Sequence, residues 1–83
     1  MIKVLLVDDH PVVREGIRGM LEAEPDLAIA GEAASGPEAV ARVAELGPDV
    51  VLMDLRMPGG DGAEATARLR AEAPGVHLSL IHI

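Results

Sequence analysis

The hydrophobic pattern along the chain contains two short, continuously apolar runs, at residues 4–7 and 50–53. Apolar runs rich in β-branched residues are typical of strands that are buried on both faces of a parallel sheet. A less apolar segment around Leu27 and Ile29 predicts a strand at an edge of that sheet, and a fourth strand is predicted from Val76 onward. The chain is therefore expected to build a sheet from these four segments.

Three helices are predicted between these strands, from apolar residues that recur at helical spacing. The first helix has an apolar face made of Val13, Ile17, Met20 and Leu21. The second starts after Ser35, which has Glu38 three residues on as in a capping box, and it stops at Gly47. The third starts with Asp61 as its cap and ends before Pro74.

The alternation of strands and helices defines the fold class. Strand-helix-strand units connect parallel strands through right-handed crossovers, and they place helices on both faces of the sheet. The chain has 83 residues, which is enough for one hydrophobic core, and it contains no internal repeat, linker or low-complexity stretch. We therefore expect an α/β, doubly wound parallel sheet in a single domain over residues 1–83.

Composition narrows the partners that such a domain can bind. Seven Lys and Arg against 14 Asp and Glu give a net charge of -7, and the chain has no aromatic residue and no cysteine. The negative charge disfavours nucleic acid and anionic membranes, and the lack of aromatic rings removes stacking platforms. The lack of thiols excludes disulfides and cysteine-based zinc sites. The start of the chain is neither a signal peptide nor a membrane span, so we expect a cytoplasmic protein.

Candidate chemistry lies where the two apolar strands end, because ligands of such sheets bind beyond the carboxyl ends of the strands. The first strand runs into Asp8 and Asp9, and the third runs into Asp54. Acidic residues ahead of Pro11 also suit the start of a helix, so the pair by itself has an ordinary structural interpretation. Three carboxylates at one edge repel each other unless a cation joins them, and an all-oxygen ligand set favours Mg²⁺. His10 is expected to be a surface or capping residue with no chemical role.

Two stretches of the sequence carry a family resemblance: VLLVDDHPVVREGI near the start and VVLMDLRMPGGDG in the middle. With the spacing of turns and helices between them, the chain resembles the receiver domain of bacterial two-component response regulators, from Ile2 to about Val76. The start is most similar to the nitrate-response type, whose receivers usually precede a helix-turn-helix DNA-binding domain. The resemblance implies a flavodoxin-like strand order 2-1-3-4, with the fifth strand and the last helices of a receiver missing.

The resemblance also implies a role for each acidic residue. Asp54 would accept a phosphoryl group from the phosphohistidine of a sensor histidine kinase. Asp9 would bind Mg²⁺ directly and Asp8 through water, while Asp54 and the backbone carbonyl of Arg56 would complete the protein ligands. Phosphoryl transfer needs mainly an in-line nucleophile and a cation that neutralises the phosphoryl oxygens, so these residue types suit it. We therefore expect a phosphoryl acceptor, not an enzyme, that normally controls transcription through an output domain.

The chain departs from the receiver pattern towards its end. A receiver also uses a Ser or Thr after strand four and a Lys after strand five, and neither has a clear counterpart. The hydroxyl position falls at or next to His82, whereas Ser79 lies inside the predicted strand and Thr66 lies on the preceding helix. The only lysine, Lys3, precedes Asp8 by five positions, or roughly 16 Å along a strand. We therefore expect a domain that is incomplete at its C-terminus.

Two alternatives to a phosphoryl acceptor remain open: a receiver-like module that binds a protein partner without phosphorylation, and an inactive fragment. A flavin-nucleotide site is disfavoured by the acids after strand one, and a dinucleotide site by the lack of a G-x-G-x-x-G motif. The strand over residues 76–83 would offer an open edge to another chain, so dimerisation or aggregation through that strand is expected.

Overall fold

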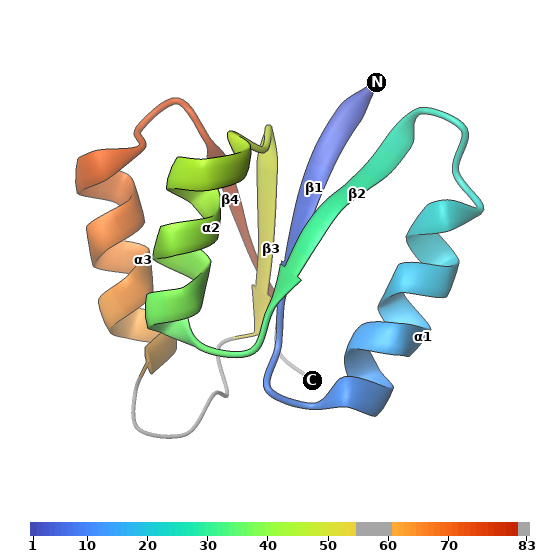
Figure 1. Cartoon of the computed structure of the whole chain (residues 1–83), viewed down its shortest axis with the longest axis horizontal. Coiled ribbons are helices and arrows are strands. Elements are labelled where there is room, and N and C mark those ends of the chain that lie inside the picture. Colours follow the sequence, from blue (N-terminus) through green and yellow to red (C-terminus); the bar gives the residue numbers. More distant parts are fainter. Residues whose placement is uncertain (55–60, 82–83) are drawn as a thin grey trace.

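Strands and helices alternate along the chain, as the hydrophobic pattern predicts. In the computed structural model, residues 1–54 and 61–81 are described. They form β1 (Ile2–Val7), α1 (Pro11–Glu22), β2 (Leu27–Ala33), α2 (Gly36–Leu46), β3 (Val50–Asp54), α3 (Asp61–Glu72) and β4 (His77–Ile81). Figure 1 shows the strands running in the same direction, with their arrowheads towards one end of the molecule.

The strands of the described residues form one parallel sheet in the order β2-β1-β3-β4, which confirms the predicted class and strand order. β1 and β3, the two apolar runs, are neighbours, and Val7 lies opposite Met53. Leu5, Val51 and Met53 on these strands are completely buried. The residues of β2 are mostly half-buried, which agrees with its weaker apolar pattern and its place at an edge.

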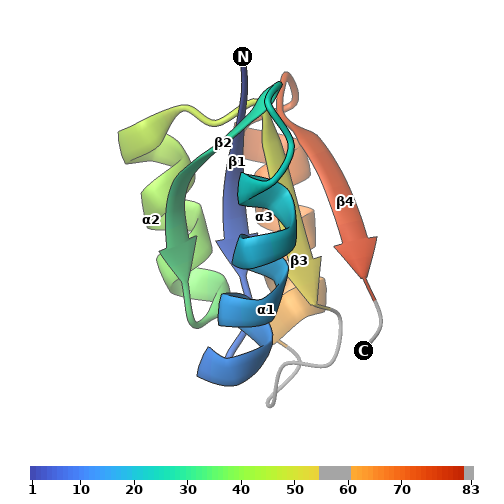
Figure 2. The same cartoon turned by 90° about the vertical axis from the view of Figure 1, so that its right-hand side faces the viewer.

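The helices cover the two faces of the sheet unequally. α2 and α3 lie side by side on one face, and α1 lies on the other (Figure 1, Figure 2). The main core lies on the side of α2 and α3 and consists of Leu5, Val7, Ala33, Ala39, Val43, Val51, Met53, Ala65 and Leu69. α1 contacts β1 and β2 on the opposite face and contributes no fully buried residue. The larger hydrophobic cluster therefore lies on the side of α2 and α3, and Val4 and Leu6 are buried outside it.

The apolar face of α1 is narrower than predicted. Val13, Ile17 and Leu21 are half-buried, but Met20 is 73% exposed. The prediction that Met20 belongs to the buried face was wrong. Ion pairs from two arginines of α1 to Glu32 hold the helix towards β2, so its contact face turns to that edge strand and Met20 lies outside it.

The ends of the helices follow the predicted signals closely. Ser35 Oγ accepts a hydrogen bond from the main-chain N–H of Glu38 at 3.2 Å, which confirms the cap of α2. Gly47 ends α2 with a φ of 56°, a left-handed conformation that residues with a Cβ adopt rarely. α3 already includes Asp61, so it begins one residue earlier than a cap at that position predicts. None of the described helices is long and apolar enough to cross a membrane.

β4 is the outer strand on one side of the described sheet. Leu78 is half-buried against the core, whereas Leu80 is 36% exposed. Association of another chain along residues 76–83 stays a prediction, and residues 82–83 lie outside the described part of the chain.

Candidate acidic site at the carboxyl edge of the sheet

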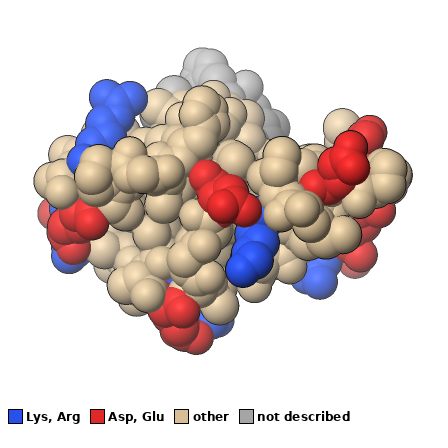
Figure 3. Space-filling model, turned by 90° about the horizontal axis from the view of Figure 1, so that it is seen from above, with Lys and Arg blue, Asp and Glu red and all other residues tan. Residues whose placement is uncertain are grey.

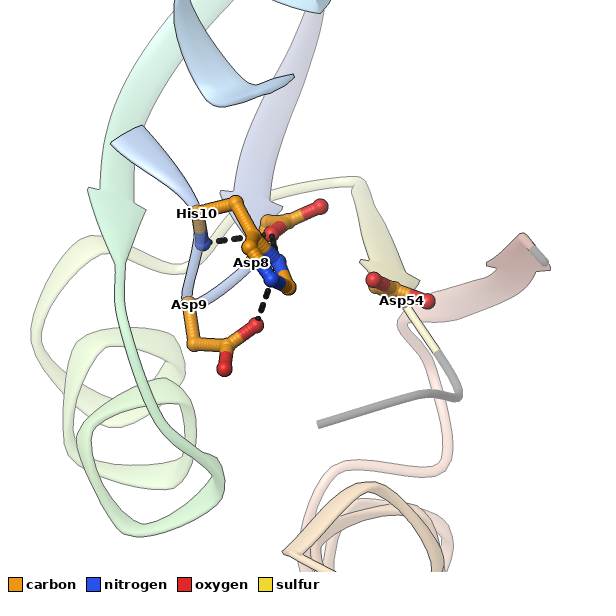
Figure 4. Close-up of side chains that lie close together, drawn as sticks. All are labelled: Asp8, Asp9, His10 and Asp54. Carbon is orange, nitrogen blue, oxygen red and sulfur yellow. Dashed lines mark hydrogen bonds and ion pairs between the residues drawn. The ribbon is translucent and has the colours of Figure 1, made fainter. Parts of the chain in front are cut away.

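Four side chains with metal-binding atoms converge where β1 and β3 end. Asp8 and Asp9 follow β1 directly, His10 comes next, and Asp54 is the last residue of β3. Because β1 and β3 are adjacent parallel strands, their carboxyl ends lie at the same edge of the sheet. One ligand atom of each residue lies within 4.8 Å of those of the others. Figure 4 shows Asp8, Asp9 and His10 grouped together, with Asp54 across from them on β3.

Asp8 is buried, and its two carboxylate oxygens have different surroundings. Oδ1 accepts a hydrogen bond from the main-chain N–H of His10 at 2.7 Å and lies 3.1 Å from His10 Nδ1. A bond to the main chain two residues on forms an Asx turn, which directs the chain from β1 into α1. Oδ2 is buried and has no hydrogen-bond partner among the described residues. Such an oxygen is unfavourable in the interior, so a cation beside it would stabilise the site.

A role at the start of the helix explains only part of this geometry. His10 is the N-cap residue of α1, no side chain makes a capping hydrogen bond there, and the first turn contains no acidic residue. Asp8 shapes the turn ahead of the helix through one oxygen. That role leaves the convergence of Asp9 and Asp54 on the same point unexplained.

His10 joins the cluster, although the sequence predicts only a surface or capping residue. Its side chain is 59% exposed, yet Nδ1 lies 2.8 Å from Oδ1 of Asp9. Asp9 Oδ1 is itself buried and accepts no well-formed hydrogen bond from the described residues. A residue before proline is restricted to extended backbone, and His10, which precedes Pro11, has φ −106° and ψ 107°. Pro11 is therefore the sequence signal that could have placed this imidazole beside the carboxylates.

Arg14 supports the site from α1, a role that the sequence pattern does not reveal. Its Nη1 donates to the main-chain carbonyl of Asp8 at 2.6 Å, and its Nε donates to Oε1 of Glu32 at 3.1 Å. Glu32 also pairs with Arg18, and this hydrogen bond, followed by the one to Glu22, raises the pKa of Arg18 above its usual range. Arg14 thus connects the end of β1 to β2 and holds the main chain beside the carboxylates.

The cluster could hold a divalent metal ion. Its carboxylates are the hard oxygen ligands that Mg²⁺ prefers, and the unpartnered Oδ2 of Asp8 fits a site that is completed by a cation. Asp54 is buried at the same edge, so a phosphoryl group on it would lie next to such an ion. The expected carbonyl ligand of Arg56 lies within residues 55–60, outside the described part of the chain.

The hydroxyl and amine of a complete receiver have no counterpart near the acids among residues 1–54 and 61–81. Thr66 Oγ1 donates to a main-chain carbonyl of its own helix at 2.7 Å. Ser79 lies in the middle of β4, and Lys3 lies near the start of β1, at the opposite edge of the sheet. The expected position at His82 is outside the described residues.

Comparison with known proteins points to the same region of the chain. Residues 4–82 match the response regulator receiver domain family, a range that includes Asp8, Asp9 and Asp54. The transcriptional regulatory protein LiaR of Bacillus subtilis (strain 168) is 54% identical over 72 residues, which cover 87% of this chain and 34% of LiaR. The chain spans little more than a third of the length of the curated relatives it matches.

Solved structures agree in fold as well as in sequence. The crystal structure of a LuxR-family two-component response regulator from Aurantimonas sp. SI85-9A1 has a TM-score of 0.93 at 40% identity, covering 99% of this chain and 59% of that one. The signal receiver domain of the response regulator NarL from Mycobacterium tuberculosis has a TM-score of 0.89 at 37% identity, covering 98% and 65%.

Proposed function

The chain belongs to the response regulator receiver domain family, and on this premise we propose that Asp54 accepts a phosphoryl group with the help of a divalent cation. Proteins of this family take part in phosphorelay signalling with sensor histidine kinases. The observation that carries the proposal is the convergence of Asp8, Asp9 and Asp54 at one edge of the sheet, with ligand atoms within 4.8 Å of one another.

Asp54 has the position of the nucleophile. One of its oxygens attacks the phosphorus atom of the donor, and an acyl phosphate forms as the bond between phosphorus and the leaving atom breaks. With phosphohistidine as the donor, the ring nitrogen leaves with the bonding electron pair and takes up a proton. Burial of Asp54 limits the access of water to the new acyl phosphate. A bound Mg²⁺ would supply the positive charge that the phosphoryl oxygens need during transfer.

The proposed ligands of the cation are Asp9 directly, Asp8 through water, Asp54, and the backbone carbonyl of Arg56. The unpartnered Oδ2 of Asp8 supports this assignment, because it is a buried acceptor with no donor among the described residues. Arg14 holds the adjacent main chain by its hydrogen bond to the Asp8 carbonyl, so the direction of the carboxylates does not depend on the cation alone.

The wider role that we propose is control of transcription through an output domain. The support comes from relatives: LiaR is a transcriptional regulatory protein, and the Aurantimonas protein is a LuxR-family response regulator. The signal would enter through a sensor histidine kinase. The net charge of -7 argues that this segment itself binds no nucleic acid.

One observation favours a second candidate, a receiver-like module that docks a partner without phosphorylation. The chain's only lysine, Lys3, lies at the opposite edge of the sheet from Asp54. Among residues 1–54 and 61–81, no lysine therefore lies beside the acids to neutralise a phosphoryl group.

Uptake of phosphate from acetyl phosphate separates the two candidates. The chain is incubated with acetyl phosphate and Mg²⁺, and acid-labile phosphate is measured by mass spectrometry of the intact protein. We expect uptake by the wild type and none by Asp54→Asn, while Asp49→Asn at the other edge of the sheet behaves like the wild type. Undiminished phosphate on Asp54→Asn would show that another residue is modified, and a wild type that takes up none would favour the docking module.

A further inference from the structure

We propose that His10 is a further ligand of the acidic site, and that its imidazole makes the site favour Co²⁺ and Zn²⁺ over Mg²⁺. The inference rests on the metal site of the proposed function and adds a ligand and a selectivity to it. It starts from an arrangement that the carboxylates alone do not explain, because His10 Nδ1 faces both Asp8 and Asp9 (Figure 4).

The distances around His10 are those of a hydrogen bond or an ion pair, and they also match the spacing of neighbouring ligands on one ion. Nδ1 lies 3.1 Å from Asp8 Oδ1 and 2.8 Å from Asp9 Oδ1. Two ligand atoms that each lie about 2.1 Å from a metal and subtend a right angle are about 3 Å apart. A small divalent cation can therefore contact the ring nitrogen and the Asp9 oxygen without a large movement of either, while Asp8 lies close enough to bind it through water.

The backbone of His10 is fixed next to the two acids. His10 donates its main-chain N–H to Asp8 Oδ1 at 2.7 Å, and Pro11 restricts it to the extended conformation that it adopts. α1 begins directly after it, so the main chain is fixed on both sides. Only the side-chain torsions then lose freedom when the ring binds a metal, which favours its use as a ligand.

The second independent sign of a ligand is the buried, unpartnered Oδ2 of Asp8, whose residue is 2% exposed. The Asp8 side chain is thus only half satisfied by the turn that it forms. A metal at this point would contact Asp9 Oδ1 and would lie beside Asp8 Oδ2, the two buried carboxylate oxygens that accept no hydrogen bond from the described residues. It would replace a proton on Nδ1, and the ring would keep its proton on Nε2, where 59% exposure of the side chain gives it access to water.

The type of ligand atom decides which cations bind more tightly when His10 takes part. Mg²⁺ prefers oxygen ligands and retains its water molecules, so an imidazole adds little to its binding. Imidazole nitrogen suits zinc and the other late first-row metals, whose affinity for mixed nitrogen and oxygen sites rises along the series from Mn²⁺ to Cu²⁺. Removing His10 should therefore weaken Co²⁺ and Zn²⁺ binding and leave Mg²⁺ binding nearly unchanged.

Isothermal titration of the chain with MgCl₂, CoCl₂ and ZnCl₂ tests the proposal. His10→Asn is the main variant, because Asn is a favourable N-cap residue and should not disturb α1. His10→Ala is the second variant, and His77→Asn is the control, since His77 lies at the start of β4, at the opposite edge of the sheet. We expect Co²⁺ and Zn²⁺ affinities to fall at least about tenfold in both His10 variants. Loss of a residue that only hydrogen-bonds to a metal ligand already lowers metal affinity by about that factor. Mg²⁺ affinity should stay within about threefold.

A second readout locates the metal directly. In the ¹⁵N spectrum of the histidine rings, Zn²⁺ should shift Nδ1 of His10 and leave the ring of His77 unchanged. Equal Zn²⁺ affinity in the wild type and both His10 variants, or a shift at His77 instead, would refute the role of His10. If the wild type binds none of the three cations, or if Asp9→Ala leaves the affinity for all of them unchanged, the metal site of the proposed function itself fails.

Discussion

The carboxyl ends and the amino ends of the strands, at opposite edges of the sheet, both carry aspartate side chains, but in opposite environments. At the carboxyl edge, Asp8 and Asp54 are each 2% exposed, and Asp8 Oδ2 has no partner among the described residues. At the amino edge, Asp49 is exposed, and its Oδ2 accepts a hydrogen bond from the main-chain N–H of Lys3 at 2.8 Å. Figure 3 looks onto this amino end, where acidic and basic side chains are dispersed over the surface and do not form a cluster.

The difference separates a solvated acid with a main-chain partner from buried acids that lie close to one another. Asp49 joins the start of β1 to the residue ahead of β3 with a solvated carboxylate, which is a favourable arrangement without any further partner. The acids at the carboxyl edge are taken out of water and placed beside each other, which disfavours the folded state unless a cation is present. The carboxyl edge therefore carries a local cost in stability that a bound cation would offset.

The largest effect in this comparison is expected for metal affinity. Asp9→Ala should weaken Mg²⁺ binding at least about tenfold, because it removes the proposed direct ligand. Asp26→Ala and Asp49→Ala remove the same charge from exposed positions and should leave the affinity unchanged. Isothermal titration of the three variants is the measurement. Equal losses in all of them would mean that net charge attracts the ion and that no site is formed.

A smaller effect of opposite sign is expected for stability without metal. Asp8→Asn should raise the free energy of unfolding by about 1 kcal/mol, because it removes one of several clustered charges and gives the position a donor. Asp49→Asn should lower the same quantity by up to about 1 kcal/mol, since it weakens a charge-assisted hydrogen bond. Urea unfolding in the presence of EDTA compares the two. A loss of stability in both variants would remove the distinction between the edges.

The smallest effect on Mg²⁺ affinity is expected from Arg14, which binds the main chain beside the acidic cluster. Arg14→Lys should lower Mg²⁺ affinity about twofold to fivefold, because a lysine cannot bind the Asp8 carbonyl and Glu32 with one planar group. Arg68→Lys is the matched control, since the Arg68–Glu72 pair is exposed on α3. The two variants are compared by titration with Mg²⁺. An affinity of Arg14→Lys equal to that of the control would show that Arg14 serves only the packing of α1.

The sequence predicts the architecture well because hydrophobic burial determines it. The runs at residues 4–7 and 50–53 are apolar because both strands are central, and the acids after them mark where the strands leave the core. From that pattern, the fold class and the meeting of the three carboxylates could be anticipated, whereas the strand order came only from the family resemblance. Met20 was misplaced because periodicity defines a face of the helix but not how far the sheet covers it.

The supporting residues of the site could not be anticipated in the same way. Arg14 lies on the outer faces of a helical wheel, yet its long side chain returns to the carbonyl of Asp8 at the end of β1. His10 is exposed by most of its surface, and Pro11 restricts its backbone but not the direction in which its ring nitrogen points. Contacts of this kind depend on the direction of single side chains, which neither composition nor spacing specifies.

The most direct test of phosphoryl acceptance at the carboxyl edge is to map the modified residue on the wild-type chain. Borohydride reduces an aspartyl phosphate to homoserine, so the chain is treated with acetyl phosphate, reduced, digested and sequenced by mass spectrometry. We predict homoserine at Asp54 when Mg²⁺ is present and little or none when EDTA replaces it. Homoserine at Asp8 or Asp9 instead, or equal labelling of Asp54 with and without the metal, would contradict the account.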